Sequence, residues 1–148
     1  MNNYVAILEE LSVKLLKALD HLDYSYNKVL KLPEDLSKMD DEELETWESF
    51  SSRFSRVSDI FIMQYLRARI ALVEPGFKGS TRDYLNKAEK FGVIESAVQW
   101  TTIRELRNAE AHEYNDTDLS EFYKKIRSLC PVLLEIRKTI AGLSDASY

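Results

Sequence analysis

Apolar residues recur at steps of three and four along most of this chain, which is the spacing of one face of an α-helix. In the first segment the series includes Leu8, Leu15, Leu22 and Val29. It predicts an amphipathic helix over about residues 3–31.

A second series consists of Trp47, Phe50, Phe54, Val57, Phe61, Ala68 and Leu72. It predicts a long helix over residues 40–73. Shorter helices are predicted over residues 81–91 and 94–112. A last helix is predicted from about Asp116, with a kink where Pro131 removes one backbone hydrogen bond.

Composition agrees with this pattern, because the 148 residues include only 4 Gly and 3 Pro. No segment shows the strict alternation of a β-strand. The expected fold is therefore all-α, an up-and-down bundle of four to five helices that forms a single domain over residues 1–148.

Charge and cysteine content limit the possible function classes. With 20 Lys and Arg against 25 Asp and Glu, the net charge is -5, which argues against a protein that coats nucleic acid over a large face. A local basic cluster, such as Arg53, Arg56, Arg104 and Arg107, is still compatible with this charge.

The single cysteine, Cys130, allows no internal disulfide and is expected to be a small buried filler. The apolar runs are shorter than the roughly 20 residues of a membrane span, so we expect a cytoplasmic protein without membrane contact.

The residues most suited to chemistry lie between Ile103 and Tyr114. On an ideal helix Arg107 and His112 point about 140° apart, and Arg104 and Asn108 lie in the arc between them. Trp100 also lies there, whereas the opposite side, the expected core face, carries Val98, Thr102, Leu106 and Ala109. An Arg that can hold phosphate oxygens and a His that can move protons suit a phosphodiester substrate. No metal site or cofactor is expected, because no Cys or His pair has metal-ligand spacing and no glycine-rich phosphate loop is present.

A structural reading of the same residues is also open. Arg107 can pair with a neighbouring acid, His112 can complement the dipole at a helix end, and Tyr114 can pack on the bundle. The other histidine, His21, is expected to be an ordinary surface residue.

The segment Arg107-Asn108-Ala109-Glu110-Ala111-His112-Glu113-Tyr114 resembles the motif of the HEPN superfamily, in which Arg is followed by Asn, then by His and Tyr at fixed spacing. Within that superfamily it resembles the toxins of pairs formed with a minimal nucleotidyltransferase antitoxin. The similarity in helix order and length extends over roughly residues 3–142.

The resemblance implies a homodimer that brings two copies of the motif to one cleft and cleaves RNA without a metal ion. It further implies that His112 is the general base or acid, that Arg107 holds the scissile phosphate, and that Asn108 orients the phosphate or His112. Tyr114 would be the residue that the partner nucleotidyltransferase adenylylates to silence the toxin. No further polar site residue is identified in the first two predicted helices.

Two alternatives are still open. Related HEPN proteins are described as non-catalytic substrate-binding or regulatory companions of a nucleotidyltransferase. A purely structural helical dimer is the other alternative, and it predicts that protein covers the face that carries the motif. Candidate dimer contacts are Trp47, Phe50 and Trp100, each of which can equally belong to the core.

Overall fold

The computed structural model describes residues 3–109 and 115–145, and this part of the chain forms helices and connecting segments without a β-strand. The helices are α1 (Asn3–Val29), η1 (Leu36–Lys38), α2 (Asp41–Asp59), η2 (Ile60–Tyr65), α3 (Leu66–Val73), α4 (Thr81–Lys90), α5 (Ala97–Ala109), α6 (Asp116–Leu134) and α7 (Ile136–Asp145). The expected all-α bundle is confirmed.

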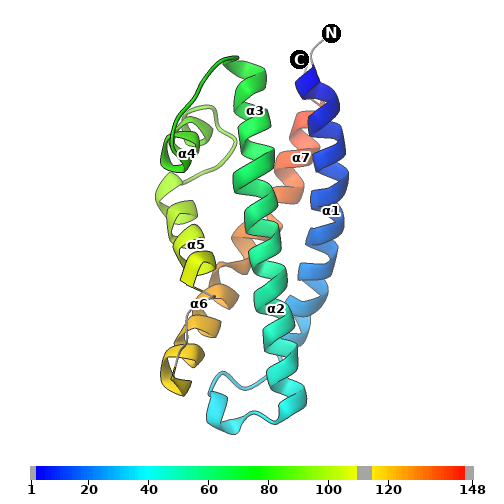
Figure 1. Ribbon diagram of the computed structural model, residues 1–148. Helices are drawn as coiled ribbons and strands as arrows, with labels where there is room; N and C mark the ends of the chain where they lie inside the picture. Colours follow the sequence, from blue (N-terminus) through cyan, green and yellow to red (C-terminus); the bar gives the residue numbers. More distant parts are fainter. Residues whose placement is uncertain (1–2, 110–114, 146–148) are drawn as a thin grey trace.

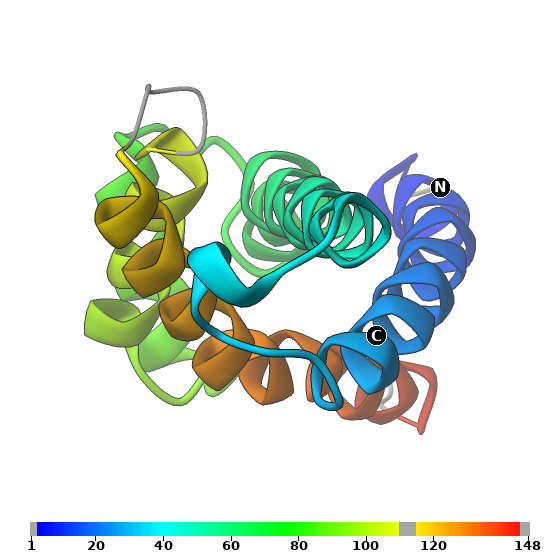
Figure 2. The same cartoon turned by 90° about the horizontal axis from the view of Figure 1, so that it is seen from below.

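A central rod organises the bundle. It consists of α2, η2 and α3, which follow one another without a break from residue 41 to 73, as the second apolar series predicts (Figure 1). Helix α1 lies along one side of the rod, and α4 and α5 lie along the other. Seen from below, α6 and α7 cross from the α5 side to the α1 side (Figure 2).

Aromatic side chains of the rod fill the core. Trp47 and Phe50 are fully buried, and the Trp47 ring stacks on Tyr123 of α6 with centroids 5.0 Å apart. Phe61 contacts Trp100 of α5 at 4.7 Å, and Trp100 is only 3% exposed. The suggestion that Trp47, Phe50 and Trp100 form a dimer interface is therefore wrong, because packing within one copy already covers all three rings.

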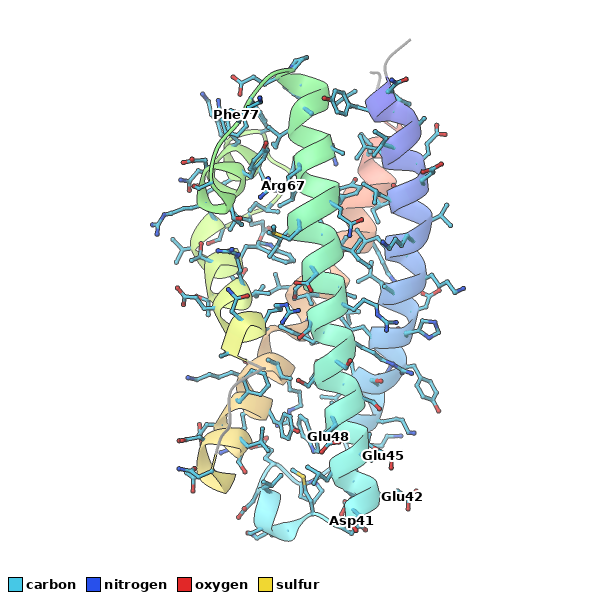
Figure 3. All side chains as sticks on the ribbon, in the orientation of Figure 1. Asp41, Glu42, Glu45, Glu48, Arg67 and Phe77 are labelled. Carbon is cyan, nitrogen blue, oxygen red and sulfur yellow. The ribbon has the colours of Figure 1, made fainter. Side chains whose placement is uncertain are left out.

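The rod begins at a well-defined cap. The Asp40 carboxylate accepts a hydrogen bond from the Glu43 N–H at 2.8 Å, and the Glu43 carboxylate accepts one from the Asp40 N–H. This capping box satisfies two N–H groups of the first turn. Further acids of the same end, Asp41, Glu42, Glu45 and Glu48, gather at the lower end of α2 (Figure 3).

The middle of the rod departs from regular α-helix. Residues Ile60 to Tyr65 form a π-helical turn, in which the Leu66 N–H donates to the Phe61 carbonyl five residues before it. Three consecutive side chains, Ile60, Phe61 and Ile62, are buried there. Such turns are rare and occur frequently at functional sites.

Helix α5 packs on the rod through a different face from the one expected. Val98 is 74% exposed, whereas Ala97, Trp100 and Ile103 are buried. Thr102 is also exposed. The expected core face is therefore wrong for Val98 and Thr102, whereas Leu106 packs against the core and Ala109 is half-buried. The physical reason is that Trp100 and Ile103 offer more apolar area than Val98 and Thr102, so the helix turns these two side chains toward the rod.

The final helix is interrupted close to its proline. Pro131 lies within α6, and the interruption falls at Glu135, whose N–H donates to the Pro131 carbonyl at 3.1 Å. The break thus comes four residues after the proline, and α7 continues from Ile136. Among the described helices, none has both the length and the apolar composition needed to cross a bilayer.

Candidate functional site

Arg107 connects α5 to the middle of the rod. Its Nε donates to Asp59 Oδ1 at 2.8 Å and its Nη2 donates to Asp59 Oδ2 at 2.9 Å. Two parallel hydrogen bonds to one carboxylate fix the plane of the guanidinium as well as its position. The pair uses the Nε–Nη2 edge of the guanidinium.

The sequence position of Arg107 explains why it meets the rod. It lies four residues after Ile103 and seven after Trp100, so it continues the buried stripe of α5 toward the end of the helix. A cation on such a stripe needs an acceptor, since partial burial without one is costly. Asp59, the last residue of α2, supplies it, and the side chains of Arg107 and Asp59 are 34% and 44% exposed.

Two hollows open on either side of this ion pair. The first, which we call the Asn108 hollow, has a volume of about 360 Å³ and is lined by Ser58, Asp59, Ile62, Met63, Gln64, Arg104, Arg107 and Asn108. The second, which we call the Lys14 hollow, has a volume of about 450 Å³ and is lined by Lys14, Ser52, Ser55, Arg56, Asp59, Ile60 and Arg107. Arg107 and Asp59 line both, so the pair belongs to the wall of each hollow.

The predicted site residues are brought together in part. Arg104 and Asn108 are exposed and line the Asn108 hollow with Arg107. His112 and Tyr114 lie outside the described residues, in the segment 110–114 that follows α5.

The predicted basic cluster is divided. Arg56 and Arg104 each share a hollow with Arg107, but the two hollows are different ones. Arg53 instead turns toward α1, where its Nη1 donates to Ser25 Oγ at 2.7 Å and to the His21 carbonyl at 3.1 Å. His21 is exposed, as expected for an ordinary surface residue.

Asp59 is the site residue that the sequence analysis missed. It is an isolated acid between Ser58 and Ile60, within an otherwise mostly apolar run that leads into the π-helical turn. An acid in such a place, far from the helix start where the dipole would favour it, is a signal that can be read from sequence. Its partner cannot be read in this way.

Cys130 and a larger hollow do not belong to this site. Cys130 is fully buried in the core, as expected, and burial together with the charge of Asp23 raises the pKa of its thiol. A hollow of about 590 Å³ lies between the α4–α5 connection and the junction of α6 and α7. Among the described motif residues, neither Arg107 nor Asn108 lines it, and Lys138 in its lining pairs with Glu135 at 3.1 Å. The two smaller hollows are therefore the better candidate site, because Arg107 and other cationic side chains line them.

A comparison with known proteins finds no match, either to a family profile or to a curated protein.

Proposed function

We propose that this protein is a metal-independent endoribonuclease, the toxin of a HEPN and minimal-nucleotidyltransferase pair, with Arg107 and His112 acting at a cleft between two copies. The observation that supports this most directly is the ion pair of Arg107 with Asp59, which lines two hollows. A guanidinium held in one orientation beside open space is suited to receive a phosphate group.

The proposed reaction uses the RNA's own hydroxyl group as the nucleophile. His112 accepts the proton of the ribose 2′-hydroxyl, and the 2′-oxygen forms a bond to phosphorus. The bond from phosphorus to the 5′-oxygen breaks, and the departing oxygen takes a proton from a water molecule. The products are a 2′,3′-cyclic phosphate and a 5′-hydroxyl.

Other residues of the Asn108 hollow would bind rather than react. Arg107 would hold the non-bridging oxygens and stabilise the charge that develops on them. Asn108 can orient the phosphate or His112 through its amide, and the exposed Arg104 adds a second cation on the same side.

The test is cleavage of RNA by purified variants. We expect His112→Ala and Arg107→Ala each to lower the cleavage rate by at least about 100-fold, since proton transfer by a positioned side chain contributes roughly 10²–10⁴-fold. The matched controls are His21→Ala and Arg82→Ala, which remove an exposed His and an exposed Arg elsewhere. Circular dichroism checks that every variant keeps its helices.

Either of two results would contradict the proposal: a folded double variant that cleaves as fast as the wild type, or a wild-type protein that binds RNA without cleaving it. The second result would favour a non-catalytic companion of a nucleotidyltransferase.

We further propose that Tyr114 is the site of silencing. Transfer of AMP from ATP to the Tyr114 oxygen, with release of pyrophosphate, would attach a phosphodiester seven positions after Arg107 in the sequence. Its negative charge would compete with RNA for the site. Co-expression with a minimal nucleotidyltransferase followed by intact-mass and peptide analysis tests this. Silencing that persists in Tyr114→Phe would remove Tyr114 from the mechanism.

A further inference from the structure

The Lys14 hollow gathers cations from three helices. Lys14 comes from α1, Arg56 from α2 and Arg107 from α5, and both Lys14 and Arg56 are exposed. The one carboxylate among its lining residues is Asp59, which already accepts two hydrogen bonds from Arg107. This hollow is therefore locally basic in a chain whose net charge is -5.

The acids at the start of the rod lie apart from Arg56. Asp41, Glu42, Glu45 and Glu48 gather at the lower end of α2 (Figure 3). Glu48 precedes Arg56 by eight residues, about 12 Å along the helix, and it lies about 6 Å from Ser52 at the near end of the hollow. Salt screens exposed charges beyond about 8 Å at physiological ionic strength, so an anion held at Arg56 experiences little repulsion from that end.

The two hollows are neighbours, because Asp59 and Arg107 line both of them. Lys14 Nζ lies 3.4 Å from Oε1 of Gln64, and Gln64 lines the Asn108 hollow. An RNA strand with its scissile phosphate at Arg107 would therefore have one neighbouring phosphate on the Lys14 side.

We propose that Lys14 and Arg56 bind the phosphate that flanks the scissile one, so that the RNA backbone crosses the ion pair from one hollow to the other. This inference rests on the proposed function for its substrate class. Arg56 can offer two parallel donors to phosphate oxygens and Lys14 a mobile point charge. The exposed hydroxyl of Ser52 is a further donor in the same hollow.

Salt dependence of binding tests this subsite without depending on cleavage. The probe is a fluorescein-labelled single-stranded 2′-O-methyl RNA, in which the hydroxyl needed for cleavage is blocked. Each phosphate that a cationic side chain neutralises on a single strand adds about 0.7 to the magnitude of the slope of log K against log salt concentration. We expect the double variant Lys14→Ala with Arg56→Ala to have a slope smaller in magnitude by at least about 0.7, because the flanking phosphate is then no longer neutralised.

The matched control is Arg82→Ala with Lys90→Ala, which removes one Arg and one Lys from exposed positions of α4 and changes the net charge equally. We expect it to keep the wild-type slope. A Lys14 and Arg56 variant with an unchanged slope would overturn the subsite, as would a wild-type protein that does not bind the probe. The nuclease proposal fails separately. If the double variant shows the expected change in slope but the wild-type protein never cleaves unmodified RNA, the nuclease proposal is overturned and the subsite still stands.

Discussion

At the scale of single residues, the pair of Arg107 and Asp59 matters more for orientation than for stability. Both side chains are about one-third exposed or more, and ion pairs in such positions contribute roughly 1 kcal/mol or less to the free energy of unfolding. Two hydrogen bonds at 2.8 and 2.9 Å nevertheless restrict the guanidinium to one plane. Asp59 is therefore a positioning residue in the proposed reaction.

A charge swap separates these two roles. We expect Asp59→Arg combined with Arg107→Asp to restore an ion pair between the same helices and to keep the melting temperature within a few degrees of the wild type. Cleavage should fall as far as in Arg107→Ala, because the cation then extends from the rod rather than from α5. Calorimetry and RNA cleavage assays measure the two effects. Full activity in the swapped protein would contradict this prediction, because it would show that the arginine can act from either helix.

The single variant Asp59→Ala tests positioning directly. We expect a loss of cleavage of about 10- to 100-fold in kcat, since a small misplacement of a positioned group has effects of this size. The loss should be smaller than in Arg107→Ala, because the cation is still present. Equal losses in the two variants would instead indicate that Asp59 itself takes part in the chemistry.

At the scale of elements, the connection between α4 and α5 determines where Arg107 meets the rod. The Val93 N–H donates to the Ala88 carbonyl at 2.8 Å and the Gly92 N–H donates to the Glu89 carbonyl at 3.0 Å, which is the hydrogen-bond pattern of a Schellman cap. Gly92 has a φ of 74°, as this cap requires. The Glu89 carboxylate then accepts from the Ala97 N–H at 2.9 Å, which joins the end of α4 to the start of α5.

Gly92→Ala is expected to lower the free energy of unfolding by about 1 kcal/mol, because an alanine is strained at positive φ. A Cβ at this position meets no atom within 4 Å, so the effect is one of backbone conformation alone. The matched variant is Gly142→Ala in α7, where an added Cβ also meets nothing and φ is not positive. It should stabilise the protein by about 0.5 kcal/mol, and urea unfolding measures both. Equal effects of the two substitutions would contradict the role of the cap.

At the scale of the whole molecule, the aromatic core leaves the dimer of the proposed function to be formed through other surfaces. Trp47, Phe50 and Trp100 are all buried within one copy. A cleft shared by two copies is still part of the proposed function, since Arg107 and His112 diverge on an ideal helix and the second copy can supply the missing group.

Mixing two inactive variants tests this shared cleft. If Arg107 of one copy acts with His112 of the other, a mixed dimer of Arg107→Ala and His112→Ala contains one complete site. Random pairing makes about half of the dimers mixed, so cleavage should recover to about a quarter of the wild-type rate. Subunits are exchanged by mild denaturation and refolding, and each variant treated alone is the control. No recovery, despite mixed dimers seen by mass spectrometry, would assign both groups to one chain.

The sequence by itself determined the long helices and most of their buried faces. In α1 the apolar spacing continues over many turns, so Leu8, Leu15 and Leu22 were predicted together and are all buried. The 13-residue α5 has too few apolar residues to define one face in this way, which is why Val98 and Thr102 were assigned to the core incorrectly. The π-helical turn was also not predicted, since it depends on packing around the rod rather than on a local signal.

Within the candidate site, the sequence determined which residues carry the proposed chemistry, because Arg104, Arg107 and Asn108 are neighbours along one helix. Only the tertiary structure decided that Arg107 meets Asp59, 48 residues away in the chain. It also decided that Lys14 and Arg56 line a hollow beside them. Helical periodicity relates residues within one element, whereas contacts between elements depend on how the helices pack, and that follows from the summed burial of their faces.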